Sequence, residues 1–75
     1  MQIDTVLVRL RATTIQTVNP DLRRGTALFF ALNEVAPQAA SKIRRTFNDP
    51  YHYDSRIPAF WEAIYEMTHD GWVID

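Results

Sequence analysis

After residue 19, apolar residues recur among polar ones with the spacing of an α-helix. In residues 20–36, one broad face contains the apolar positions together with a glycine: Leu22, Gly25, Leu28, Phe29, Leu32, Val35 and Ala36. Recurrence at three- and four-residue intervals is typical of an amphipathic α-helix. Asn19 can cap such a helix, Pro20 fits its first position, and Asp21 meets the positive end of its dipole. The pattern therefore predicts a helix over residues 20–35.

Gly25 is an unusual residue for the interior of this predicted helix. Glycine there costs about 1 kcal/mol relative to alanine. We therefore expect another backbone to approach it closely, either the polar and aromatic loop of residues 51–56 or the last helix. Phe30 lies beside the main apolar stripe, so it is expected either to widen the core face or to be exposed.

A second, shorter helix is predicted over residues 37–47. Proline is tolerated in the first turn of a helix, so Pro37 can end the previous helix and start this one. The positions expected to face inward are Ala39, Ala40, Ile43 and Phe47. Asn48-Asp49-Pro50 should stop the helix, because a residue before proline is pushed out of the α region.

The third predicted helix covers residues 57–68, with Pro58 inside its first turn. Its bulky apolar stripe follows the i, i+3, i+4, i+7 pattern and consists of Ile57, Phe60, Trp61, Ile64, Tyr65 and Thr68. Gly71 is expected at the C′ position that ends the helix. The tail from Trp72 to Ile74 would then fold back onto the core or pair as a short strand.

Residues 3–18 carry conflicting signals. Ile3, Val6, Leu7 and Leu10 follow a helical stripe, but a segment rich in Val, Ile and Thr also suits a strand. We favour the helix. The predicted fold class is all-α, a small bundle of three to four short helices with residues 1–75 as one domain; the alternative is α+β, with an N-terminal strand pairing the C-terminal tail. The expected core is Leu28, Phe29, Leu32, Ile43, Phe60, Trp61 and Ile64.

Composition restricts the function classes. The 75 residues are 47% hydrophobic and include no cysteine, which excludes disulfides, thiol nucleophiles and cysteine-ligated metals. A chain of this length is near the lower limit for a lone hydrophobic core. No apolar run has the length of a membrane span, and charged residues stand where a signal peptide would be apolar. We expect a cytoplasmic protein that does not enter membranes.

The charge is distributed unevenly. Residues 1–47 carry seven basic groups against three acidic ones, and residues 48–75 carry one basic group against six acidic ones. Either the two parts neutralise each other on packing, or the molecule presents one charged face to a partner. Seven of the eight basic groups are arginines, which form planar bidentate contacts and stack on aromatic rings.

No arrangement of residues predicts catalysis. His52, Asp54 and Ser55 lie close in sequence, but neighbours in one loop do not have the geometry of a catalytic triad. Asp49, His52 and Asp54 are possible metal ligands in type, yet they have no recognised spacing. With two glycines in the chain, there is no glycine-rich phosphate loop. We predict a non-enzymatic protein without a cofactor or a metal.

Motifs between Gly25 and Phe60, roughly half of the chain, resemble a family. They are Gly25-x-x-Leu28-Phe29-x-x-Leu32, Pro37-x-x-Ala40-x-x-Ile43-Arg44-x-Thr46-x-x-Asp49-Pro50-Tyr51 and Asp54-x-Arg56-Ile57-Pro58-Ala59-Phe60. The run resembles small uncharacterised proteins of tailed phages and prophages and covers Gly25 to Phe60. Thr26 and Phe30 stand where that pattern has Gln and Asn, and His52-Tyr53 are irregular in it. The resemblance implies a viral or prophage origin and a helical fold, and it implies no activity.

Two function classes follow. The first is a small accessory protein that binds a host protein, as an inhibitor or an anti-defence factor, because Tyr and Arg are enriched at binding hot spots. Its expected binding residues are Arg44, Arg45, Tyr51, His52, Tyr53 and Arg56. Arg56 is expected to pair with Asp49 or Asp54 and so fix the loop.

The alternative is a small helical nucleic-acid-binding domain. In that reading, Arg44 and Arg45 form a phosphate-contacting patch with Arg23 and Arg24. An isoelectric point near 6.0 and the acidic second part of the chain argue against it.

Overall fold

The computed structural model describes residues 2–72, with the side chains of residues 2–68. It contains four α-helices, α1 (Thr5–Val18), α2 (Arg24–Val35), α3 (Pro37–Ile43) and α4 (Ile57–Trp72), and a 3₁₀ turn, η1 (Asp54–Arg56). The prediction of an all-α bundle is therefore confirmed. The α+β alternative is wrong, because residues 5–10 are helical and no strand occurs in the described part. The predicted fold-back of the tail concerns the Trp72 side chain and residues 73–75, which lie outside that part.

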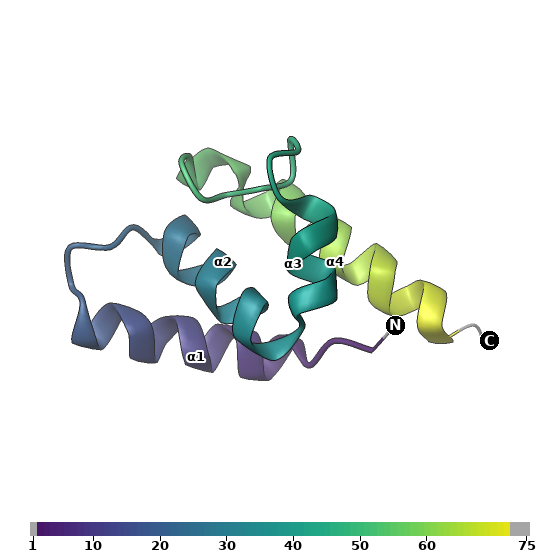
Figure 1. Ribbon diagram of the computed structural model, residues 1–75, viewed down its shortest axis with the longest axis horizontal. Coiled ribbons are helices and arrows are strands. Elements are labelled where there is room, and N and C mark those ends of the chain that lie inside the picture. The colour runs from purple at the N-terminus through teal and green to yellow at the C-terminus, as the bar shows by residue number, and fades with distance from the viewer. Residues whose placement is uncertain (1, 73–75) are drawn as a thin grey trace.

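The helices form an elongated arrangement of 40 × 22 × 18 Å. Figure 1 shows α1 along one side of the molecule, with α2 packed on it and α3 turning back directly after α2. α4 packs against α3, and the connection from α3 to α4 passes over α2 before η1 leads into α4. One hydrophobic core joins the helices, with Leu28, Leu32, Phe60 and Ile64 fully buried.

The predicted core is confirmed for six of its seven residues, because Trp61 packs on the core only partly buried. Phe47 was expected to face inward, and that is wrong: its side chain is 70% exposed. α3 ends at Ile43, four residues before Phe47, so the helical period that would have turned Phe47 inward stops. Ala39, Ala40 and Ile43 are buried as predicted.

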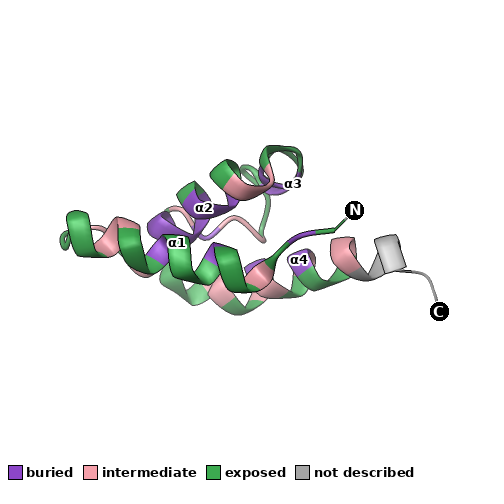
Figure 2. Ribbon diagram, turned by 90° about the horizontal axis from the view of Figure 1, so that it is seen from below, coloured by how far each residue is buried: buried purple, intermediate pink, exposed green. Residues whose placement is uncertain are grey.

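The helix over the N-terminal segment is confirmed, but its predicted inward face is largely wrong. Ile3 is buried as expected, whereas Val6 and Leu10 are 63% and 61% exposed. Buried instead are Val8 and Ala12, and the outward side of α1 is exposed in Figure 2. The small Ala12 and the alanines of α2 allow the two helices to approach closely, and all three alanines are fully buried: Ala12, Ala27 and Ala31.

Besides the early end of α3, the start of α2 and the end of α4 differ from their predictions. Asn19 ends α1 by donating its N–H to Ile15 O, Pro20 lies in a turn, and α2 begins only at Arg24. Asn-Pro-Asp is favoured in turns as well as at helix starts, which explains the error. Gly71 does not end α4, which continues to Trp72. No helix of the described part combines the length and the apolar character needed to cross a membrane.

Candidate interaction site

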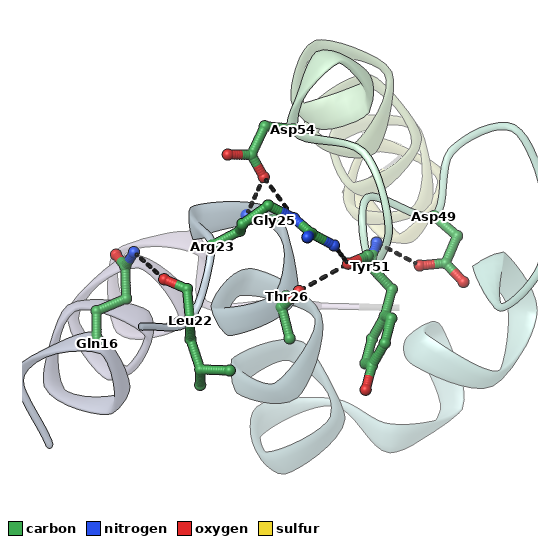
Figure 3. Close-up of polar contacts among 8 residues, drawn as sticks. All are labelled: Gln16, Leu22, Arg23, Gly25, Thr26, Asp49, Tyr51 and Asp54. Atoms are coloured by element: carbon green, nitrogen blue, oxygen red, sulfur yellow. Dashed lines mark hydrogen bonds and ion pairs between the residues drawn. The ribbon is translucent and has the colours of Figure 1, made fainter. Parts of the chain in front are cut away.

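The connection between α3 and α4, residues 44–56, lies against the first turn of α2 (Figure 3). A Cβ atom added to Gly25 would overlap the carbonyl oxygen of Pro50 and lie 2.9 Å from Asp54 Oδ1. Only glycine allows this approach, because a backbone carbonyl cannot move away as a flexible side chain would. The predicted close approach of another backbone to Gly25 is confirmed, and it comes from Pro50, directly before the loop of residues 51–56.

Asp54 holds the end of the connection at the start of α2. Its Oδ1 accepts a hydrogen bond from Gly25 N at 2.9 Å and lies 4.0 Å from Arg23 Nε. The residue before α2, Arg23, makes no side-chain cap, so Asp54 satisfies one of the free N–H groups at this helix end. A carboxylate is also favoured there by the helix dipole. Asp54 therefore caps α2, where Asp54 or Asp49 had been expected to pair with Arg56.

The middle of the connection is fixed through the backbone of Tyr51. Its carbonyl oxygen accepts hydrogen bonds from Thr26 Oγ1 at 2.7 Å and from an Arg23 guanidinium nitrogen at 3.1 Å. Thr26 is 6% exposed, so the first of these bonds is shielded from water. The sequence pattern did not show this role for Thr26, because a threonine inside a helix carries no signal for a distant backbone partner.

Asp49 fixes the turn that follows α3. Its Oδ2 accepts from Arg45 N at 2.8 Å and its Oδ1 accepts from Tyr51 N at 3.0 Å. Arg45 has φ of 65°, in the left-handed region that residues with a side chain rarely adopt. Such a conformation costs about 1–3 kcal/mol and persists where surrounding contacts impose it. The hydrogen bond that Arg45 N donates to Asp49 is one such contact.

All six predicted binding residues lie around one cavity of about 380 Å³. They are Arg44, Arg45, Tyr51, His52, Tyr53 and Arg56, and the other lining residues are Phe29, Phe30, Thr46 and Asp49. Its size falls within the range of about 300–1,000 Å³ that ligand pockets have. Sequence reasoning missed Phe29 and Phe30, which α2 contributes; Phe29 had been assigned wholly to the core. Phe30 is 38% exposed and forms part of the wall.

Aromatic rings form a continuous row along the cavity. Phe29 and Phe30 both meet the Tyr51 ring edge to face, with centroids 6.0 and 5.6 Å away. Tyr51 then contacts His52 at 4.8 Å, and His52 contacts Tyr53 at 6.4 Å. Tyr51 is half-buried, whereas His52 and Tyr53 are exposed. Edge-to-face pairs of this kind restrain each ring, so the row has a defined shape.

The prediction that Arg56 pairs with Asp49 or Asp54 is wrong. Its guanidinium carbon lies 4.9 Å from the Tyr53 ring centroid and 5.1 Å from that of Phe47. The two carboxylates are held by backbone N–H groups instead. Arg44 is similarly placed, with its guanidinium carbon 5.7 Å from the Phe29 ring centroid.

The four arginines proposed for a nucleic-acid patch do not gather. Arg23 binds the Tyr51 carbonyl, and Arg24 donates to Thr13 Oγ1 and Gln16 Oε1 of α1. Only Arg44 and Arg45 remain at the cavity, where Arg56 joins them. Within the described residues, no group of three or more His, Asp or Glu side chains could hold a metal ion. The site therefore offers guanidinium groups and aromatic rings, which are groups for recognition.

Comparison with known protein families, with curated proteins and with solved structures finds no match for this chain. The resemblance to phage and prophage proteins thus stays a prediction from the sequence motifs.

Proposed function

We propose that this chain is a small non-enzymatic accessory protein of phage or prophage type that acts by binding a host protein. The observation that carries the proposal is the cavity that the α3–α4 connection forms with α2. It combines three arginines with an aromatic row, and Arg and Tyr are the residue types that most often dominate binding energy. The phage and host assignment rests on the sequence resemblance alone.

The way in which the cavity is held supports a binding role. Asp49, Asp54 and Thr26 fix the connection through backbone atoms, which leaves the side chains of His52, Tyr53 and Arg56 at the surface. A surface whose backbone is already ordered loses little conformational freedom on binding, and this favours affinity. The left-handed Arg45 within the same turn is the kind of backbone outlier that clusters at functional sites.

A nucleic-acid-binding function has weaker support. Phosphate binding needs several cations placed along a backbone, and Arg23 and Arg24 are engaged in contacts within the chain. The net charge of −1 supplies no general attraction to DNA or RNA.

Partner capture from a bacterial lysate tests the proposal. His52→Ala and Tyr53→Ala remove exposed rings without removing the backbone contacts that hold the connection. If these rings are hot spots, each variant should weaken capture by about 2 kcal/mol of binding free energy, with an unchanged thermal melt. Tyr51→Ala is a poorer probe, because its ring also packs on Phe29 and Phe30.

Val18→Ser serves as the matched control, because Val18 is 72% exposed at the end of α1 and does not line the cavity. It should capture the partner as the wild type does. Capture that is equal for all variants would contradict the proposal. Co-migration with DNA at low salt, lost in Arg44→Glu with Arg45→Glu, would support the nucleic-acid alternative instead.

A further inference from the structure

We infer that the cavity binds an acidic peptide segment, whose carboxylates lie among Arg44, Arg45 and Arg56. The inference rests on the proposed function and specifies the chemistry of the partner. The arginines of the chain fall into two groups, according to whether their guanidinium groups already have a hydrogen-bond acceptor.

Four of the seven arginines have partners within the chain. Arg9 donates to Tyr65 Oη at 2.8 Å, and Arg11 pairs with Glu34 at 2.8 Å. Arg23 donates to the Tyr51 carbonyl, and Arg24 to Gln16 Oε1 at 2.9 Å. The remaining three are Arg44, Arg45 and Arg56, whose guanidinium groups make no hydrogen bond or ion pair with the described residues. All three line the same cavity.

Among the described residues, Asp49 is the one carboxylate in the cavity wall, and it does not serve these arginines. Asp49 directs one oxygen to Arg45 N and the other to Tyr51 N. Three guanidinium groups therefore share the cavity with a single carboxylate that is bound to the backbone. This excess of positive charge is complementary to an anionic ligand, although the chain as a whole carries a net charge of −1.

Two of these arginines lie over aromatic rings, within the distance of a cation–π contact. Arg56 lies over the rings of Tyr53 and Phe47, and Arg44 lies over Phe29. A ring contacts the face of a guanidinium and leaves its N–H edge free. The free edge has the fork geometry that matches a carboxylate with two parallel hydrogen bonds. A ring contact favours one placement of the side chain, so less rotamer entropy is lost when the carboxylate binds.

A peptide fits the cavity better than a nucleic acid does. The cations are grouped around one concave space, whereas a phosphate backbone needs them along a track, and Arg23 and Arg24 do not extend the group. Phe30, Tyr51 and Tyr53 supply an apolar wall beside the cations. An acidic segment that also bears an apolar or aromatic side chain would use both parts of the cavity.

Selection from a display library of short random peptides tests the inference. Peptides rich in Asp and Glu should be enriched on the wild-type protein. A selected peptide, made synthetically, should lose about tenfold or more in affinity when its Asp and Glu are replaced by Asn and Gln, because hydrogen bonds to charged groups are lost. Its binding should also weaken as the salt concentration rises.

Three variants locate the binding site. Arg45→Gly removes a guanidinium and keeps the left-handed backbone, which glycine adopts without strain. Arg56→Gln removes the stacked cation, and Arg11→Gln is a control with the same change in net charge outside the cavity. We expect the first two to weaken peptide binding about tenfold or more, and the control to bind as the wild type does.

Several results would overturn the inference. They are enrichment of neutral or basic peptides, no enrichment at all, equal weakening by Arg11→Gln, or preferential binding of single-stranded DNA over the selected peptide. If His52→Ala and Tyr53→Ala still abolish partner capture while Arg45→Gly and Arg56→Gln leave it intact, the proposed function stands and only the acidic ligand is wrong. If no cavity variant affects capture, the proposed function itself fails.

Discussion

Two regions differ in how many specific contacts they make. One is the junction between α2 and residues 44–56, and the other is the outward face of α1. At the junction, backbone atoms of Gly25, Arg45 and Tyr51 are bound by specific side chains, and a glycine Cα lies against a carbonyl oxygen. On α1, Val6, Leu10 and Val18 are exposed and contact little. Yet the apolar pattern of α1 is the more regular of the two in the sequence.

The difference shows that an apolar stripe identifies a helix more reliably than it identifies the buried side of that helix. α1 buries Val8 and Ala12 because small residues let its backbone approach α2. The junction depends on single residues with no period, so its structure is sensitive to individual substitutions. We therefore expect substitutions at the junction to destabilise the protein and equivalent ones on the face of α1 to have little effect.

Among substitutions at the junction, the largest effect is expected for Gly25→Ala. In a free helix this change would add about 1 kcal/mol of stability. Here the new methyl group meets the Pro50 carbonyl and displaces Asp54 from Gly25 N, so the free energy of unfolding should fall by about 3 kcal/mol. Urea denaturation measures it, with Asn33→Ala on the exposed side of the same helix as the control. A stabilised Gly25→Ala protein would show that the loop does not approach α2.

Asp49→Ala should have the next largest effect. It removes both hydrogen bonds that hold the turn after α3, at Arg45 N and Tyr51 N. We expect a loss of about 1–3 kcal/mol in the free energy of unfolding, because hydrogen bonds to a charged group are lost. Ser41→Ala, at an exposed position of α3, is a suitable control. Unchanged stability would mean that Asp49 does not hold the turn.

Arg45→Gly should change stability in the opposite direction. Glycine relieves the left-handed strain, so we expect a gain of up to about 1 kcal/mol despite the larger entropy of the unfolded chain. The matched variant is Arg44→Gly, whose φ of −55° brings no strain to relieve and which should be destabilised. Thermal melts of the two variants test this. Equal destabilisation of both would contradict the left-handed conformation of Arg45.

The smallest effect is expected for Leu10→Gln on α1. Leu and Gln have similar helix propensities, and Leu10 is 61% exposed, so the free energy of unfolding should change by no more than about 0.5 kcal/mol. The same substitution at the buried Leu28 should cost about 2–5 kcal/mol or more. If Leu10→Gln instead melted much earlier, the face of α1 would have to be buried in solution.

The sequence predicted three helices from a strong apolar period, and it favoured the helix over residues 3–18 against a competing strand signal. It also predicted that another backbone packs on Gly25, because glycine is unfavourable inside a helix and its presence indicates a close approach. It placed the start of α2 wrongly, because Asn19-Pro20 is compatible with a helix start and with a turn. It placed the buried face of α1 wrongly, because close packing of two helices favours small residues there. The six candidate binding residues lie around one cavity, which the sequence did not predict, and their role in binding stays a prediction.

Individual partners within the site could not be predicted. Arg56 was predicted to pair with a carboxylate close to it in sequence, but Asp49 and Asp54 accept hydrogen bonds from backbone N–H groups instead. Such competition depends on which backbone groups lack a partner after folding, and that becomes visible only in three dimensions.

The most direct test of the central claim is to map the surface that a bound partner contacts. Two-dimensional NMR of the ¹⁵N-labelled protein, titrated with the captured partner or the selected peptide, reports this residue by residue. We predict that the largest shift changes fall on residues 44–56 and on Phe29 and Phe30. Changes confined to the face of α1, at Val6, Leu10 and Val18, would contradict the assignment of the cavity as the binding site.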